Sequence, residues 1–159
     1  MKKLIVLIMA LGSLFALSSC TSSKQEQVSV YSFCGKNEHI AISNGVIVLS
    51  DTKDVFYGGS LEFIDSDTMD NIESYCATFY TIRNEEQTPI LIDELVNQSS
   101  VEILSIDLGK QSSTGSDVDS SFEHIVELQN NFWCEFKMTD LNGVSKVYMI
   151  ELTLTEITN

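Results

Sequence analysis

The stretch that decides the fold is FWCEFKMTDLNGVSKVYMIELTLTEI, residues 132–157. Apolar and polar side chains alternate along both halves of this stretch, which is the period of two that a half-buried β-strand requires. Asn142 and Gly143 lie between the halves, and an Asn-Gly pair between alternating strands is the strongest short-range signal for a hairpin turn. The stretch therefore predicts a long antiparallel hairpin in which residues 132–139 pair with residues 147–157.

One face of this hairpin is expected to lie in a core. Its members are Phe132, Cys134, Phe136 and Met138 in the first strand and Tyr148, Ile150, Leu152 and Leu154 in the second. Residues 75–82 show apolar side chains on both faces of a predicted strand. Strands of this kind need opposing layers to cover them, which favours a two-layer architecture.

Shorter strands are expected before the hairpin. They are predicted at residues 27–33, 39–42, 46–49, 55–63, 101–108 and 122–128. Ser43-Asn44-Gly45 is predicted to be the turn of a second hairpin, because it lies between two apolar runs. Gly58-Gly59 predicts a bulge or a close backbone approach inside one strand.

Three segments lack a clear strand pattern. Residues 65–73 are predicted to form a loop with one helical turn near 69–73, and residues 109–121 a polar loop. Residues 88–97 fit a short helix, with Thr88 as N-cap and Pro89 in the first turn, and fit equally well a strand that starts at Ile90.

The predicted fold is a single all-β domain over residues 28–159. Nine or so short strands with turn signals every eight to twelve residues favour a two-sheet antiparallel sandwich of the immunoglobulin-like kind, with at most one or two short helices. A lipocalin-like β-barrel is the alternative. About 130 residues is an ordinary size for one domain, and neither a repeat nor a second composition regime divides them.

The first nineteen residues have the features of a bacterial export signal. Lys2 and Lys3 supply positive charge, and an apolar run follows from Leu4 to Leu17. This run is shorter than the roughly 20 residues that a membrane-spanning helix needs. Residues 1–19 are therefore predicted to be a signal peptide that is removed from the mature protein.

The tetrapeptide Leu17-Ser18-Ser19-Cys20 resembles the lipobox of bacterial lipoproteins, in which small residues separate an aliphatic residue from an invariant cysteine. The resemblance implies that Cys20 becomes the mature N-terminus and carries a thioether-linked diacylglycerol and usually an N-linked acyl chain. Thr21 in place of Asp implies the outer membrane in a Gram-negative cell, with the leaflet left open. An ordinary secretory cleavage near Ser19 is the alternative.

The charge of the mature chain limits its partners. The whole chain has a net charge of −14, and removing residues 1–19 takes away two lysines and no acids, which leaves −16. Such a charge argues against nucleic acid as a partner and is repelled by anionic headgroups. Residues 20–27 are expected to be a polar lipidated tether with a reach of about 15 Å. The sequence thus predicts a domain that stands off the bilayer and is held by its lipid alone.

Three cysteines remain besides Cys20, namely Cys34, Cys76 and Cys134. One disulfide with one free thiol and three free thiols both fit this odd number, and spacing does not choose a pair. Because all three lie in apolar strand patterns, we expect them to be small core residues.

Sequence motifs for a metal, a cofactor or catalysis are weak. Asp65, Asp67 and Asp70 form a loose calcium candidate that lacks the glycine and glutamate of an EF-hand, and Asp117, Asp119 and Glu123 form a weaker one. Cys34, His39, His124 and Cys134 match no structural zinc spacing. Trp133 and the tyrosines Tyr31, Tyr57, Tyr80 and Tyr148 are the candidates for a carbohydrate platform, although most lie in strand registers that favour core packing.

The expected function is that of a non-enzymatic, lipid-anchored envelope module with no cofactor. It would bind or scaffold an envelope protein or a glycan. A carrier of a small apolar molecule or glycan in a barrel cavity is the second hypothesis. The third is a hydrolase without a recognisable motif, since no nucleophile elbow is present.

Overall fold

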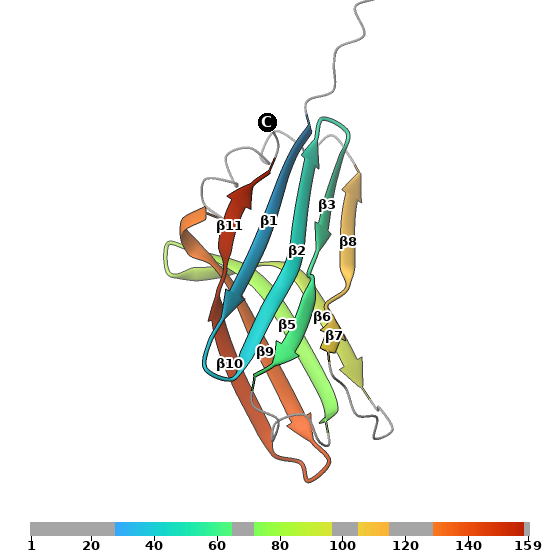
Figure 1. Cartoon of the computed structure of the whole chain (residues 1–159), viewed down its shortest axis with the longest axis vertical. Coiled ribbons are helices and arrows are strands. Elements are labelled where there is room, and N and C mark those ends of the chain that lie inside the picture. Colours follow the sequence, from blue (N-terminus) through green and yellow to red (C-terminus); the bar gives the residue numbers. More distant parts are fainter. Residues whose placement is uncertain (1–27, 65–71, 97–104, 115–128, 158–159) are drawn as a thin grey trace, which may run out of the picture.

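A computed structural model describes residues 28–64, 72–96, 105–114 and 129–157 (Figure 1). The described strands form two antiparallel sheets. Sheet A has the order β11-β1-β2-β3-β8; in addition, β4 pairs with β2, and β7 pairs with β4. Sheet B has the order β10-β9-β5-β6. The strands are β1 (Val28–Lys36), β2 (Ile40–Ser50), β3 (Lys53–Tyr57), β4 (Ser60–Phe63), β5 (Ile72–Arg83), β6 (Glu86–Val96), β7 (Ser105–Asp107), β8 (Lys110–Thr114), β9 (Phe132–Asp140), β10 (Ser145–Glu151) and β11 (Thr153–Glu156).

The two sheets pack face to face, which confirms the predicted β-sandwich. The barrel alternative is wrong for this part of the chain, because its strands form two separate sheets and not one closed one. Helix is limited there to one turn at residues 129–131. The described ranges alone contain eleven strands, where about nine were expected for the domain.

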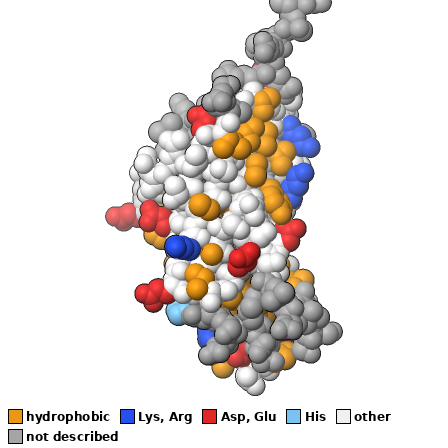
Figure 2. Space-filling view, viewed as in Figure 1, with side chains coloured by type: hydrophobic (Ala, Val, Ile, Leu, Met, Phe, Trp, Pro, Cys, Tyr) orange, Lys and Arg blue, Asp and Glu red, His pale blue; other side chains and the backbone are white. Residues whose placement is uncertain are grey.

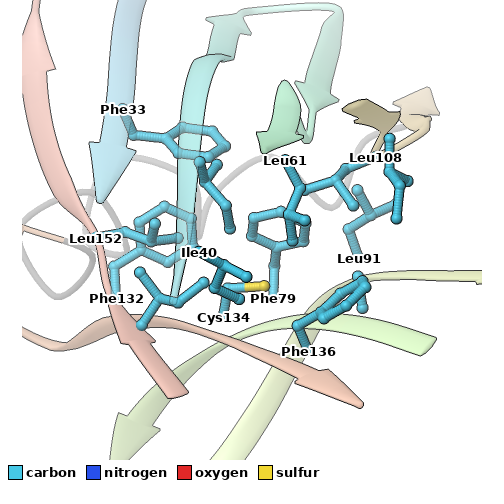
Figure 3. Close-up of a cluster of buried hydrophobic side chains, with 14 of the residues drawn as sticks. Phe33, Ile40, Leu61, Phe79, Leu91, Leu108, Phe132, Cys134, Phe136 and Leu152 are labelled. Carbon is cyan, nitrogen blue, oxygen red and sulfur yellow. The ribbon is translucent and has the colours of Figure 1, made fainter. Parts of the chain in front are cut away.

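Four phenylalanine rings lie at the centre of the sandwich. Phe33 and Phe56 come from sheet A, and Phe79 and Phe132 come from sheet B. Figure 3 labels Phe33, Phe79 and Phe132. All six pairs among them are in contact, with ring centroids 5.0 to 6.2 Å apart. Aromatic pairs at such separations add about 0.5–1.5 kcal/mol each beyond the burial of their surface. This phenylalanine cluster therefore joins the two sheets directly.

Aliphatic and further aromatic side chains extend this core towards the other end of the sandwich. Phe136 lies 5.6 Å from the ring of Tyr75 and 6.0 Å from that of Phe63. The inward face predicted for residues 132–157 is confirmed, because all eight of its members are buried. Aliphatic members of the same core include Ile40, Ile42, Leu61, Leu91, Ile106 and Leu108.

The hairpin turn predicted at Ser43-Asn44-Gly45 is wrong, because β2 runs through this tripeptide without turning. Asn44 does adopt the left-handed backbone that an Asn-Gly turn uses, with a φ of 59°, but it forms a bulge inside the strand. Gly45 pairs with Phe33 across the sheet, and a Cβ on Gly45 would overlap the Phe33 ring. The glycine is thus required by a ring that covers it from the neighbouring strand.

The actual turn between β1 and β2 is organised by Asn37. Its side-chain oxygen accepts hydrogen bonds from the backbone amides of His39, at 2.8 Å, and Ile40, at 2.9 Å. Its side-chain amide donates to the carbonyl oxygen of Met149, at 3.2 Å. One asparagine therefore closes the hairpin of sheet A and ties it to β10 of sheet B.

Sheet A is interrupted at the level of Asn44, where β3 is followed by β4 and β7 is followed by β8. We call this level the crease. The β2 bulge at Asn44 lies beside Gly59, whose missing side chain leaves room for the carbonyl of Ser43. Pairing continues across the crease, since Gly58 donates to the carbonyl of Gly109 and Leu108 donates to the carbonyl of Gly59. This confirms the close backbone approach predicted for Gly58-Gly59. Above the crease, towards the N-terminal end of β1, β2 pairs with β3, and below it β2 pairs with β4.

The closing hairpin is confirmed around Asn142-Gly143, but its second strand is not continuous. Residues 145–151 pair with β9 in sheet B, whereas residues 153–156 pair with β1 in sheet A. Leu152 lies at the switch and donates its amide to the carbonyl of Phe132. The alternation of side chains continues through the switch because both sheets cover the same core.

Other predictions for local structure need correction. Residues 86–96 form β6, so the helix interpretation of residues 88–97 is wrong; Pro89 is accommodated because β6 is an edge strand. Residues 110–114 of the predicted polar loop form β8, which pairs with β3. Ile72 and Glu73 begin β5, so they do not belong to a helical turn.

Only one face of β5 is fully covered. Phe79 faces the core. On the other face Tyr80 is buried, but Cys76 and Thr78 are partly exposed and Ile82 is exposed, so the prediction that both faces are largely buried holds there for Tyr80 alone. The predicted strand at residues 122–128 and most of the loop at residues 65–73 lie outside the described residues.

The contact between Gly45 and Phe33 gives a stability prediction. Gly45→Ala should lower the free energy of unfolding by about 1–3 kcal/mol, because the new methyl group must displace the Phe33 ring from the cluster. Combining it with Phe33→Leu should give a smaller loss than the sum of the two single losses, as expected for residues in contact. Urea denaturation of the four proteins measures this coupling, and strictly additive losses would contradict the packing.

Candidate functional site

Apolar side chains gather on the outer face of sheet A, above the crease. Figure 2 shows them as a continuous orange area over β1 to β3, with basic side chains at its edge. We call this area the valine strip. Its members are Val28, Val30, Val46, Val48, Val55, Tyr57 and Ile157.

Strand pairing places these side chains next to one another. Val30 pairs with Val48, and Val48 pairs with Val55. Ile157 continues the row, because its amide donates to the carbonyl of Val30 at 2.8 Å. Directly paired residues of neighbouring strands point to the same face of a sheet, so four branched apolar side chains form one unbroken row.

The strip is open to solvent to different degrees along its length. Val28 is 45 % exposed and Ile157 is 57 % exposed, whereas its other members are partly buried by their neighbours. Contiguous apolar surface of this kind marks an interaction site more often than isolated apolar residues do. The strip is therefore a candidate interaction surface of the described domain.

The charges around the strip differ from those of the chain as a whole. Lys53 and Lys110 are exposed at its β3–β8 side. Among the described strand residues that face outward above the crease, none is acidic. Glu62, Asp107 and Lys36 lie on the same face of sheet A below the crease. The outward strand positions of the upper half thus carry two lysines, and the exposed Asp51 lies in the turn between β2 and β3 at the same end.

Tyr57 marks the boundary between the two halves. Its hydroxyl donates a hydrogen bond to the carboxylate of Asp107, and this bond raises the pKa of Tyr57. The tyrosine ring therefore belongs to the strip, while its polar end points to the half below the crease.

A second polar contact lies at the edge of the sandwich between β5 and β6. The hydroxyl of Tyr75 donates to Oδ2 of Asp93 at 3.0 Å. Burial and the negative charge of Asp93 raise the pKa of Tyr75. Gly109 of sheet A packs against the same carboxylate, since a Cβ there would lie 2.7 Å from Oδ1. This contact joins the sheets and gives the aspartate a structural role.

The three cysteines of the domain are free and differ in environment. Cys134 is buried, as expected, and burial raises the pKa of its thiol. Cys76 is partly buried, and burial raises the pKa of its thiol too, next to Glu94. Cys34 is exposed on the outer face of sheet A, so the prediction that all three are core residues is wrong for Cys34 and only partly right for Cys76. Cys34 points outward because it follows the inward Phe33 in β1.

The predicted metal residues are not brought together where the structure describes them. Cys34 lies on the outer face of sheet A and Cys134 lies in the core. His39 is exposed, with its ring 5.6 Å from that of Tyr148. In the described ranges no three His, Cys, Asp or Glu side chains converge. The remaining candidates, Asp65, Asp67, Asp70, Asp117, Asp119, Glu123 and His124, lie outside those ranges, as does Cys20.

The aromatic residues proposed for carbohydrate binding are also divided. Tyr31 and Tyr148 are buried in the core. Trp133 and Tyr80 pair with each other on the outer face of sheet B, where Tyr80 is 1 % exposed. Tyr57 lies on the other sheet. The structure therefore does not gather them into one platform.

Comparison of the chain with family models, curated proteins and solved structures finds no match. The valine strip was not recognised in the sequence. The sequence does contain a signal for this strip. Both alternating faces of residues 28–33 and 46–49 are largely apolar, whereas a strand with one face in solvent needs only one apolar face. Among the described residues, no helix is long and apolar enough to cross a bilayer.

The thiol environments predict an order of reaction. Without reductant, the mature protein should contain three free thiols besides acylated Cys20, and a maleimide should label Cys34 first. Cys134 should react only after denaturation, because it is buried and its raised pKa lowers the fraction of reactive thiolate at neutral pH. Peptide mapping measures the order, and Cys34→Ser should remove only the fast phase. One free thiol in place of three, or rapid labelling of Cys134, would contradict these environments.

Proposed function

We propose that this protein is a lipid-anchored module of the bacterial cell envelope that binds or scaffolds another component and is not an enzyme. The signal peptide and the lipobox-like residues 17–20 support attachment through Cys20. The observation that carries the binding role is exposed apolar surface on the outside of a folded domain that begins where the tether ends. It lies in the valine strip of sheet A and at Ile92, Val147 and Met149 on the outer face of sheet B.

The packing of the sandwich favours this role over that of a carrier. A carrier of the kind expected from the sequence needs an internal cavity. Between the described sheets the central space is occupied by the phenylalanine cluster and the aliphatic residues around it (Figure 3). An envelope protein or a glycan would then bind on the outside of the domain.

The location follows from the anchor. Two or three acyl chains give far stronger membrane attachment than one chain, so release from the membrane is negligible. Thr21 after the lipidated cysteine favours the outer membrane in a Gram-negative cell. The eight residues 20–27 keep the domain close to that membrane.

Replacement of the lipidated cysteine tests the anchor. In the native host, Cys20→Ser should move the protein from the membrane fraction to the soluble or unprocessed fraction, because the thioether cannot form. Mass spectrometry of the wild type should show a lipid adduct on a peptide that begins at Cys20. Cys34→Ser is the matched control, since it removes an exposed thiol outside the lipobox and should leave fractionation unchanged. Membrane attachment of Cys20→Ser equal to the wild type would overturn the proposal.

A further inference from the structure

The valine strip lies at the end of the domain from which the tether leaves. Val28 is both a member of the strip and the first described residue, and eight residues separate it from the end of the signal peptide. In Figure 1 the described chain starts at the top of sheet A, next to the turn between β2 and β3. A tether with a reach of about 15 Å keeps this end of the sheet beside the bilayer.

We propose that the valine strip rests on the phospholipid bilayer that carries the anchor, with Lys53 and Lys110 directed to anionic headgroups. The proposal rests on the proposed function, because the lipid on Cys20 is what brings the strip to the bilayer. It adds a second contact and an orientation, in which the outer face of sheet A above the crease is turned to the membrane and the outer face of sheet B is left for the partner.

The side chains of the strip suit the boundary between headgroups and acyl chains. Valine and isoleucine bury apolar surface there. Tyrosine is favoured at this depth because its ring is apolar and its hydroxyl is polar. Lysine keeps its charge in the headgroup layer while its stem covers apolar surface. Tyr57, Lys53 and Lys110 stand at the border of the strip, where these properties are needed.

The distribution of charge allows this contact in a protein that is acidic overall. A net charge of −16 predicts repulsion from anionic headgroups when it is treated as evenly spread. The structure places Glu62 and Asp107 below the crease, whereas the outward-facing strand positions above it carry Lys53 and Lys110 and no acid. The strip thus meets anionic headgroups through Lys53 and Lys110, while Glu62 and Asp107 lie on the other side of the crease from the tether.

The anchor makes a weak contact sufficient. A strip of seven side chains would bind a bilayer poorly from solution, but a tethered domain meets the bilayer at an effective concentration near the millimolar range. The strip therefore has to favour the docked orientation only modestly. Membrane attachment through the lipid anchor and orientation through the small apolar surface then add to each other.

Tryptophan quenching by brominated lipid tests the orientation. The mature, acylated protein with Trp133→Phe is reconstituted into vesicles of phosphatidylcholine and phosphatidylglycerol, with bromine on the acyl chains of the phosphatidylcholine. One variant adds Ser112→Trp, beside Val55 above the crease, and its matched control adds Ser105→Trp, beside Glu62 below it. Both serines are exposed and lie on the same edge of sheet A.

Quenching should be about threefold stronger in Ser112→Trp than in Ser105→Trp, because an interfacial apolar face lies about 5–10 Å inside the headgroup boundary. Adding Lys53→Glu and Lys110→Glu to the first variant should reduce this quenching, since each lysine near an anionic surface shifts the docked population roughly fivefold. Circular dichroism of every variant confirms that the domain is folded before the comparison is made.

Three other outcomes would contradict the anchor, the orientation or the bilayer as the binding partner. If the protein does not float with the vesicles, the anchor and with it the proposed function fail. If it floats but the two tryptophans are quenched equally, the orientation fails and the anchor stands. If Val28→Glu with Ile157→Glu abolishes a concentration-dependent dimer in detergent and leaves quenching unchanged, the strip binds a second copy of the chain and not the bilayer.

Discussion

The phenylalanine cluster is the contact on which the rest of the structure depends. Its rings are contributed equally by the two sheets, and they meet at the level of the β2 bulge. The cluster fits only because Gly45 offers a bare backbone to Phe33. Asn44 adopts a left-handed backbone conformation, which lets β2 keep its pairing on both sides of the bulge. The bulge, the glycine and the crease in sheet A are therefore parts of one arrangement that seats the rings.

The proposed functional surface follows from the same arrangement. Because side chains alternate along a strand, placing Phe56 in the core turns Val55 and Tyr57 outward. The core positions of Tyr31 and Ile47 in the same way expose their neighbours in β1 and β2. The crease separates this apolar half, bordered by Lys53 and Lys110, from the polar half that holds Glu62, Asp107 and Lys36. The strand register that places these residues in the core thus also produces two different outer surfaces at the two ends of sheet A.

The sequence predicted those features that depend on neighbouring residues. The hairpin around Asn142-Gly143 and the inward face of residues 132–157 could be read from alternation alone. Asn44-Gly45 could not, because its role depends on Phe33 in another strand, and β8 could not, because residues 110–114 become a strand through backbone pairing with β3 and carry no apolar pattern. The switch at Leu152 leaves the alternation intact and so gives no sequence signal.

The candidate site shows the same division. Lipidation of Cys20 was predicted from a local motif, whereas the valine strip joins residues 28–57 to Ile157 and becomes visible only when the strands are paired.

Nuclear Overhauser contacts between the phenylalanine rings test whether the cluster joins the two sheets. With selectively labelled phenylalanine, we expect cross-peaks between Phe33 and Phe132 and between Phe56 and Phe79, whose ring centroids lie 5.0 Å and 5.3 Å apart. Each of these pairs joins sheet A to sheet B. A folded protein in which these cross-sheet peaks are absent, while contacts within each sheet are present, would contradict the packing on which both the fold and the proposed surface depend.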